Sequence, residues 1–315
     1  MSKDPQYFSY AANRSKISWS QAVQALRQGH QLERAQIKDM FIKQEGKTLL
    51  NRAALIPELG IGVKAVSVFA DNQRLHNLPT VQGMMIVYDP DNGAVRGMID
   101  ARLITEIKTA ADSVLGAQLL APSEPKQLLI VGAGTVAKSL ISAYSACFKS
   151  LESIRVWARR IDAASQLCAQ MKSETSQLDL QATTDLPSAL AQADIISAAT
   201  LARSPILLGK DIQRGCHLDL IGAFQDDMRE ADDALLRKSS LYVDARETTM
   251  EHIGELLIPL QQGVISEKDI RADLYDLLAL PPLGRSSADE ITLFKNGGGA
   301  HLDLMIADMI LKLCG

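Results

Sequence analysis

The stretch of this 315-residue sequence that most constrains its fold is a strand–turn–helix–strand pattern at residues 127–160. An apolar run of strand length at residues 128–131 leads into a turn of the form G-x-G-x-x-A at residues 132–137. A helical segment follows, and a second apolar strand at residues 154–158 closes the unit. A βαβ unit of this spacing is typical of dinucleotide-binding domains. The pattern therefore predicts an α/β fold with a doubly wound parallel sheet of the Rossmann type.

Each small residue of the turn has a physical reason in such a loop. Gly132 permits the tight turn, Gly134 has no Cβ and lets a pyrophosphate approach the backbone, and Ala137 lets the helix pack close to the strand. The helix N-terminus adds N–H groups and a partial positive charge. A tight turn without a ligand is the alternative, and the flanking strand–helix–strand order argues against it. The predicted cofactor-binding residues of the loop are Gly132, Ala133, Gly134, Thr135, Val136 and Ala137.

The end of the second strand indicates which nicotinamide cofactor is bound. An NAD site usually has an Asp or Glu there to bind the ribose 2′-OH. This strand is followed by Arg159 and Arg160, with no carboxylate before Asp162. Two guanidinium groups suit a 2′-phosphate, which they can bind in a fork. The sequence therefore favours NADPH, with NADH as the second choice; a solvated basic turn is the alternative interpretation of the two arginines.

Composition narrows the class of protein. The chain is 47% apolar and 22% charged with a net charge of −4, an ordinary balance for a soluble protein of two domains that speaks against nucleic-acid binding. No apolar run approaches the ~20 residues of a membrane span, and the N-terminus lacks the apolar core of a signal peptide. We therefore expect a cytoplasmic protein that binds no membrane. The histidine spacing predicts no metal site, and the cysteines are expected to be free thiols, namely Cys147, Cys168, Cys216 and Cys314.

The segment before the nucleotide-binding pattern changes from helical to β-rich. Residues 18–45 are predicted to be helical, with Ser18 as the N-cap and Gly29 as a stop signal. A strong turn signal at residues 89–93 separates two strands of the β-rich part. Antiparallel sheet is therefore predicted around three short runs, at residues 47–50, 62–69 and 83–88.

The domain boundary is expected where prolines end a helix at residues 105–121. Strands and helices then alternate to about residue 285, as in a parallel sheet. Residues 291–314 are predicted to form an apolar helix that packs back on the first domain. The predicted domains are residues 1–121 plus 291–315 and residues 122–290. The further strands of the second domain are expected at residues 194–199, 217–222 and 241–244.

Polar and apolar residues at the carboxyl ends of these strands are candidates for ligand contact, because open α/β sheets bind ligands there. Thr200 and Leu201 follow one strand, and Gly222, Ala223 and Phe224 follow the next. Thr200 can reach a nicotinamide or a ribose, and a structural loop threonine is the equally weighted alternative.

Three cations stand out outside the nucleotide-binding pattern. Lys64 lies in an otherwise apolar strand and shares a face with Val66 and Val68 by alternation. A lysine on a core-facing position is unfavourable unless an anion neutralises it, so Lys64 is a candidate to hold a substrate carboxylate or to protonate an imine. Arg52 and Lys108 are the other two. The alternatives are an edge-strand lysine at position 64 and a solvated helix face at position 108.

These residues together resemble the ornithine cyclodeaminase/mu-crystallin family over nearly the whole chain. The resemblance rests on the GVKAVSVF strand, the helix motif Lys108-Thr109-Ala110-Ala111, the GAGTVA loop, the HLDLIGA strand with its Met228-Arg229-Glu230 continuation, and the late GRSSADEITLFKNGGGA segment. It implies a substrate-binding and dimerisation domain completed by the C-terminal helix, a Rossmann domain, and a homodimer.

The resemblance also implies roles for single residues. Arg52, Lys64 and Lys108 match the positions that bind the substrate carboxylate in the family, where the third is usually arginine; lysine supplies the charge without the bidentate fork. Phe224 stands where ornithine cyclodeaminases and the family's alanine dehydrogenases carry a catalytic aspartate. Phenylalanine can only shape an apolar pocket around a ring.

The resemblance therefore implies reduction of a preformed cyclic imino acid with NADPH. The expected substrate is Δ1-pyrroline-2-carboxylate or its six-membered analogue, Δ1-piperideine-2-carboxylate, and the expected product is L-proline or L-pipecolate. Lys64 is the expected catalytic residue. The enzymatic alternatives are ornithine cyclodeamination, an amino-acid dehydrogenase and an opine-type coupling enzyme. A non-catalytic NADPH-dependent small-ligand binder is the alternative of another class.

Overall fold

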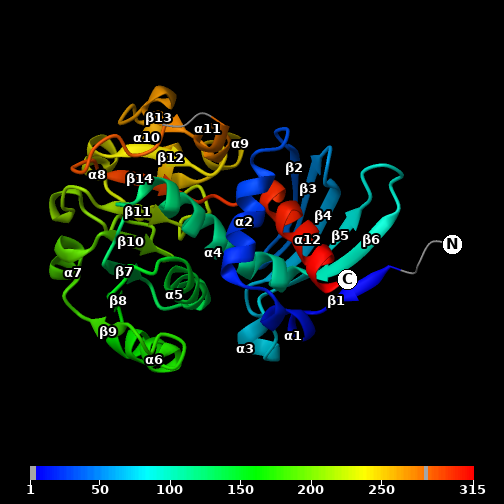
Figure 1. Ribbon diagram of the computed structural model, residues 1–315, viewed down its shortest axis with the longest axis horizontal. Coiled ribbons are helices and arrows are strands. Elements are labelled where there is room, and N and C mark those ends of the chain that lie inside the picture. Colours follow the sequence, from blue (N-terminus) through cyan, green and yellow to red (C-terminus); the bar gives the residue numbers. More distant parts are fainter. Residues whose placement is uncertain (1–4, 280–282) are drawn as a thin grey trace. The chain divides into compact units, whose positions relative to one another are not determined.

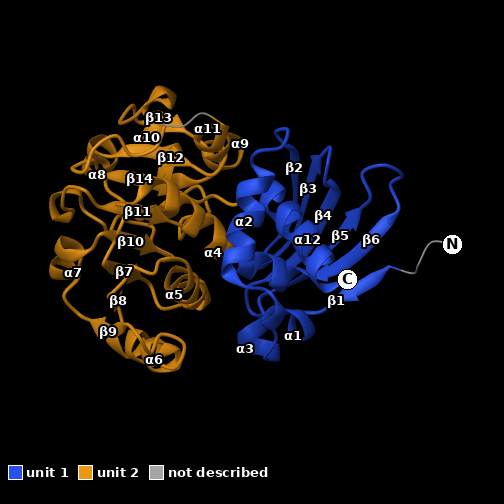
Figure 2. Ribbon diagram, in the orientation of Figure 1, with its two compact units in different colours: residues 1–108, 299–315 blue, residues 109–298 orange. Residues whose placement is uncertain are grey.

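The computed structural model describes residues 5–279 and 283–315 (Figure 1). The chain forms two compact units, residues 1–108 with 299–315 and residues 109–298 (Figure 2). The first unit holds a six-stranded sheet and the second an eight-stranded sheet whose paired strands are all parallel. The α/β fold with a doubly wound parallel sheet is thus confirmed.

The sheet of the first unit has the strand order β1-β6-β5-β4-β3-β2. Neighbouring strands are antiparallel except β1 and β6, which are parallel. Helix α12 (Ala300–Cys314) packs against the sheet at β3 and β4 and against helix α2 (Trp19–Gly29), which buries its residues 300–310. The strands are β1 (Gln6–Phe8), β2 (Gln36–Gln44), β3 (Lys47–Ile56), β4 (Gly60–Phe69), β5 (Val81–Tyr88) and β6 (Val95–Asp100), and the short helices are α1 (Tyr10–Asn13) and α3 (Asn72–His76).

The predicted antiparallel runs and the turn between β5 and β6 are confirmed. Ser18 is the N-cap of α2, and with Gln21 it forms a capping box. The helix predicted at residues 18–45 is wrong beyond residue 29, because residues 36–44 form strand β2. Strand β2 is paired along its whole length with β3 and lies at the edge of the sheet. Its conformation is therefore set by a partner strand and not by its own periodicity.

The sheet of the second unit has the strand order β13-β12-β14-β11-β10-β7-β8-β9. Its strands are β7 (Gln127–Val131), β8 (Ser153–Trp157), β9 (Asp179–Thr183), β10 (Ile195–Ala198), β11 (His217–Leu220), β12 (Ser240–Val243), β13 (Ile270–Ala272) and β14 (Thr292–Lys295). The helices are α5 (Thr135–Cys147), α6 (Ile161–Met171), α7 (Leu186–Gln192), α8 (Asp233–Lys238), α9 (Arg246–Thr249), α10 (Gly254–Gln261) and α11 (Leu274–Ala279). All the strands predicted from the sequence in this part are present.

The strand order of the second sheet reverses between β7 and β10. From β7 the chain proceeds to β8 and β9 on one side, and then returns to place β10 and β11 on the other side. In open parallel sheets the crevice at such a reversal, outside the carboxyl ends of the strands, is where dinucleotides bind. The fold therefore puts the G-x-G-x-x-A turn after β7 at the position expected for a cofactor loop.

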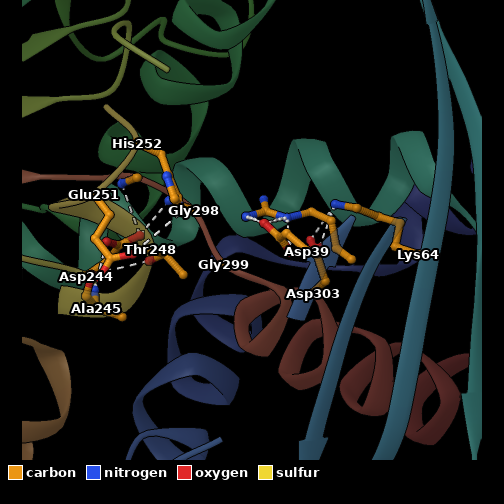
Figure 3. A network of polar contacts seen from close by, with 12 residues as sticks. Asp39, Lys64, Asp244, Ala245, Thr248, Glu251, His252, Gly298, Gly299 and Asp303 are labelled. Carbon is orange, nitrogen blue, oxygen red and sulfur yellow. Dashed lines mark hydrogen bonds and ion pairs between the residues drawn. The ribbon is translucent and has the colours of Figure 1, made fainter. Parts of the chain in front are cut away.

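The unit boundaries differ from the predicted domain boundaries at both places. Helix α4 (Ala101–Leu120) is one continuous helix, and the first unit ends within it at Lys108 rather than at residue 121. Residues 291–298 belong to the second unit, because β14 is a buried strand between β11 and β12 and the C-terminal helix begins only at Ala300. The Asp244 carboxylate fixes the segment after β14 by accepting hydrogen bonds from the N–H group of Gly297 and from that of Gly298 (Figure 3).

Three further observations bear on the class of protein. None of the helices among the described residues is long and apolar enough to cross a bilayer. The described residues also contain no group of three or more His, Cys, Asp or Glu side chains arranged to hold a metal ion. The four cysteines, all within the described residues, form no disulfide bond.

Candidate functional site

The turn after β7 has the geometry of a dinucleotide loop. Gly132 has a φ of +125°, which L side chains rarely adopt, and a Cβ on it would lie 2.6 Å from the carbonyl oxygen of Ala199. Gly134 is the N-cap of α5, is exposed, and would present a Cβ to open space. Ala137 is fully buried. The open backbone at the N-terminus of α5 therefore fits a pyrophosphate, with Ala133, Thr135 and Val136 around it.

Arg159 and Arg160 follow the end of β8, and Arg160 is the N-cap of α6. Both side chains are exposed. Within residues 5–279 and 283–315 neither guanidinium makes an ion pair with a carboxylate. Two unengaged guanidinium groups at the end of the second strand could hold a phosphate on the adenosine ribose, and they are equally compatible with the solvated turn.

The loops after β10 and β11 carry the remaining candidates of the second unit. Leu201 is 77% exposed and Phe224 is 58% exposed. The hydroxyl and the backbone N–H of Thr200 both donate to the buried carboxylate of Glu230, at 2.7 and 2.8 Å. The hydroxyl of Thr200 is thus engaged within the loop, which supports the interpretation of a structural threonine.

The first unit gathers its predicted cations around a carboxylate that the sequence did not single out. Lys64 lies on the core face of β4 and is 4% exposed, as its alternation with the valines predicts. Its ammonium group lies 2.7 Å from the carboxylate of Asp303, toward which it points (Figure 3). Lys108 of α4 lies 3.1 Å from the same carboxylate and donates to the carbonyl of Gly299 at 3.2 Å. Asp303 therefore holds two buried ammonium groups at once.

Burial and neighbouring charges set the protonation of this cluster. Burial, followed by the repulsion of Lys108 and Arg52, lowers the pKa of Lys64 to about 7 against the attraction of Asp303. Burial alone would raise the pKa of Asp303, but the attraction of Lys108 and Lys64 outweighs it and brings the value to about 2. Asp303 is therefore a carboxylate at neutral pH, and Lys64 can give or take a proton there.

Arg52 completes the cluster from the neighbouring strand. It stands directly opposite Lys64 in the β3–β4 pair. Its guanidinium binds the Asp39 carboxylate of β2 through Nε at 3.0 Å and Nη2 at 2.7 Å. The rings of His30 and His301 meet edge to face nearby. Burial, followed by the charges of His30, Lys108 and Arg52, lowers the pKa of His301 well below its usual value. The imidazole is thus neutral, and the charge of the cluster lies on lysine, arginine and aspartate.

Comparison with known proteins adds a family to this geometry. The model of the ornithine cyclodeaminase/mu-crystallin family matches residues 17–313, which is nearly the whole chain. The chain belongs to this family. Its Rossmann-type sheet and its separate cation-bearing unit are thus the two units of an ornithine cyclodeaminase/mu-crystallin protein.

Relatives within the family are similar over their full length. The chain is 51% identical over 312 residues to the Δ1-pyrroline-2-carboxylate reductase of Paracoccus denitrificans, which covers 99% of this chain and 98% of the relative. The structure of Thermococcus litoralis Δ1-pyrroline-2-carboxylate reductase in complex with NADH and L-proline superimposes with a TM-score of 0.90 at 26% identity, covering 98% and 97% of the two chains. An archaeal alanine dehydrogenase dimer with bound NAD gives a TM-score of 0.90 at 25% identity, covering 98% and 95%.

Two candidate site residues, Asp303 and Glu230, were not predicted from the sequence. Asp303 could have been noticed as an acidic residue in a helix whose first eleven residues are otherwise mostly apolar. Glu230 was part of a matched motif but had no role, because its partners lie in loops far from it in the sequence. Both are buried carboxylates, and both hold residues that had been predicted as site residues.

Proposed function

We propose that the chain reduces Δ1-pyrroline-2-carboxylate to L-proline with a nicotinamide cofactor, and accepts Δ1-piperideine-2-carboxylate as well. The observation that carries the proposal is the buried cluster of Lys64, Lys108 and Asp303 in a chain of this family. The relatives named as Δ1-pyrroline-2-carboxylate reductases support it.

The charge of the cluster fits a monocarboxylate. Three cations, Arg52, Lys64 and Lys108, face two carboxylates, Asp39 and Asp303, so one positive charge remains when all are ionised. A buried excess charge is unfavourable alone and is neutralised by one anionic group. A cyclic imino acid brings one carboxylate to this site.

The chain supplies binding and proton transfer, while the bound cofactor supplies the hydride that adds to C2 of the imine. Arg52 and Lys108 hold the substrate carboxylate. Lys64 donates a proton to the ring nitrogen, so that the C=N bond becomes a C–N bond with one hydrogen added at each end. An ammonium group whose pKa lies near neutrality is suited to this transfer.

The residue at position 224 distinguishes this reaction from others of the family. Phe224 offers an apolar ring and no proton-accepting group, and its exposed side chain can line a ring-shaped substrate. Deamination of ornithine and oxidation of alanine need a base or an activated water near the α-carbon. We therefore place the chain among the reductases of cyclic imines.

The direct test follows NADPH oxidation with Δ1-pyrroline-2-carboxylate, beside L-ornithine with NAD+ and pyruvate with ammonia. We expect turnover with the cyclic imine alone. Proline formation from ornithine without imine reduction would contradict the proposal. Tight NADPH binding without turnover on five- or six-membered imines would favour a small-ligand binder.

We further propose that NADPH is preferred over NADH, because Arg159 and Arg160 lie unengaged at the end of β8. Changing Arg159 to Asp is expected to raise the KM for NADPH about tenfold or more, since a charge-assisted hydrogen bond is lost and a repulsion is added. The KM for NADH should stay within about twofold. The matched control is Arg237→Asp, the same charge change at an exposed position of α8. An equal effect of Arg159→Asp on both cofactors would contradict the preference.

We also propose a cytoplasmic homodimer in which the first unit provides the interface and, with α12, the substrate site. Large apolar side chains are exposed on its sheet at Met40, Phe41, Ile42 and Ile61. Exposed apolar groups of this kind mark interaction surfaces. The related alanine dehydrogenase is described as a dimer. Light scattering after gel filtration should give twice the chain mass of 34.2 kDa.

A further inference from the structure

The carboxylate of Glu230 ties together two loops at the carboxyl ends of adjacent strands. One oxygen accepts from the N–H and the hydroxyl of Thr200, in the loop after β10, at 2.8 and 2.7 Å. The other oxygen accepts from the N–H of Gly222, in the loop after β11, at 2.7 Å. Glu230 is fully buried. We call Glu230, Thr200 and Gly222 the Glu230 clamp.

The clamp borders the predicted cofactor crevice. Strand β10 is the neighbour of β7 at the reversal of strand order. The loop after β10 touches the glycine turn itself, since a Cβ on Gly132 would lie 2.6 Å from the Ala199 oxygen and 3.7 Å from a methyl group of Thr200. The two clamped loops also meet, because a Cβ on Gly222 would lie 2.1 Å from the carbonyl oxygen of Thr200. The contacts therefore run without a gap from the glycine turn to the loop that bears Phe224.

Glu230 is itself held in place by buried groups. Its N–H and that of Ala231 donate to the two oxygens of Glu255, at 2.7 and 3.0 Å. The ammonium of the fully buried Lys295 binds the carbonyl oxygen at the end of β11, Leu220, at 2.9 Å and attracts both glutamates. The clamp is thus fixed at its base and cannot turn away without exposing several buried polar groups.

The chemistry of the clamp requires a carboxylate. Three donors converge on two oxygens, and an ionised carboxylate is an acceptor at both. A glutamine at position 230 would keep the shape but would direct an NH2 donor at the N–H of Gly222 or at Thr200. One loop would then lose its anchor and leave a buried donor unpaired.

We propose that Glu230 is a positioning residue for the nicotinamide half of the cofactor: it sets the spacing of the loops after β10 and β11, which form the wall of the crevice beyond the glycine turn. The proposal rests on cofactor binding in the proposed function and not on the identity of the imine. The adenosine half is held elsewhere, by the glycine turn and the end of β8. Loss of the clamp therefore affects one half of the dinucleotide.

The test compares the whole cofactor with a fragment of it. Dissociation constants for NADPH and for 2′,5′-ADP, which lacks the nicotinamide riboside, are measured by calorimetry on the wild type, Glu230→Gln and Thr200→Val. We expect Glu230→Gln to weaken NADPH binding about 10- to 100-fold and to leave 2′,5′-ADP within about twofold. Thr200→Val removes one of the three donors, so its dissociation constant for NADPH should lie between those of the wild type and Glu230→Gln.

The matched control is Glu290→Gln, at the opposite end of the same sheet. The Glu290 carboxylate also binds several partners, Ser240, Arg271 and Ser286, and stands before the first residue of β14. The Glu290→Gln substitution should change neither the dissociation constant for NADPH nor that for 2′,5′-ADP. If Glu230→Gln weakened both ligands equally, its role would be general to the fold, and if it weakened neither, the clamp would be irrelevant to binding. Both results would overturn the proposal. Because no turnover is needed, failure of the imine assay would leave this test intact.

Discussion

Changing Lys64 to Met is expected to lower kcat/KM for Δ1-pyrroline-2-carboxylate about 100- to 10,000-fold, the range usual for loss of a positioned acid or base. Methionine has a similar length and apolar character, so the core face of β4 stays filled while the ammonium group disappears. The matched control is Lys38→Met on β2, where the side chain is exposed and lies in the same unit. A loss below about fivefold for Lys64→Met would assign Lys64 a structural role only.

The pH profile separates proton donation from carboxylate binding at Lys64. The pKa of this ammonium is lowered to about 7, so the proton is present below that pH and is lost above it. The kcat/KM of the wild type should therefore fall as the pH rises above about 7. In Lys64→Arg the group stays charged throughout, so a fall that reports Lys64 should vanish from the profile. If kcat/KM of Lys64→Arg fell at the same pH as that of the wild type, the titrating group would be the substrate or another residue.

The sequence predicted those features that depend on local patterns. The glycine turn, its flanking strands and the core-facing position of Lys64 are each encoded within a few neighbouring residues, and the structure has all of them. Family membership was likewise carried by short motifs in a fixed order. The assignment of roles to Arg159, Arg160 and Phe224 stays a prediction, because it depends on ligands.

Features that depend on distant partners were missed. Lys64 and Asp303 are separated by 239 positions in the sequence, so no local pattern could predict their contact. The predicted C-terminal helix wrongly includes strand β14, because these four residues directly precede an apolar tail. Only the pairing of β14 with β11 and β12 makes it a strand. Strand β2 was assigned to a helix for the same reason, since pairing with β3 determines it.

Changing Asp303 to Ala is expected to destabilise the first unit by about 3–5 kcal/mol, because it leaves the ammonium groups of Lys64 and Lys108 buried without their counter-ion. The sequence offers a clean reporter. Its two tryptophans lie one in each unit, with Trp19 buried in the first and Trp157 in β8 of the second. In a Trp157→Phe background, tryptophan fluorescence during urea unfolding follows the first unit alone.

An exposed ion pair of the same unit provides the control. Arg74 and Asp71 lie 2.9 Å apart with side chains 70% and 59% exposed, and Asp71→Ala should change the free energy of unfolding by no more than about 1 kcal/mol. The free energy of unfolding, measured as the pH is lowered, gives a second test. The pKa of Asp303 is lowered to about 2, so its stabilising charge is present above the usual carboxyl pKa of 3.8 and is lost as the pH falls toward 2. Asp303→Asn should lack that loss.

Replacing Lys64, Lys108 and Asp303 together by apolar residues tests whether their charges stabilise the fold or serve substrate binding. Breaking a buried ion cluster by removing one member is strongly destabilising, whereas replacing the whole cluster by apolar side chains of similar volume is often neutral or stabilising. The triple variant Lys64→Met, Lys108→Met, Asp303→Leu should therefore regain most of the stability that Asp303→Ala loses, while imine reduction stays abolished. Such a result would mean that the charges are kept for the substrate carboxylate and the proton, and not for the fold. A triple variant as unstable as Asp303→Ala would mean instead that the ion cluster itself holds β4, α4 and α12 in place.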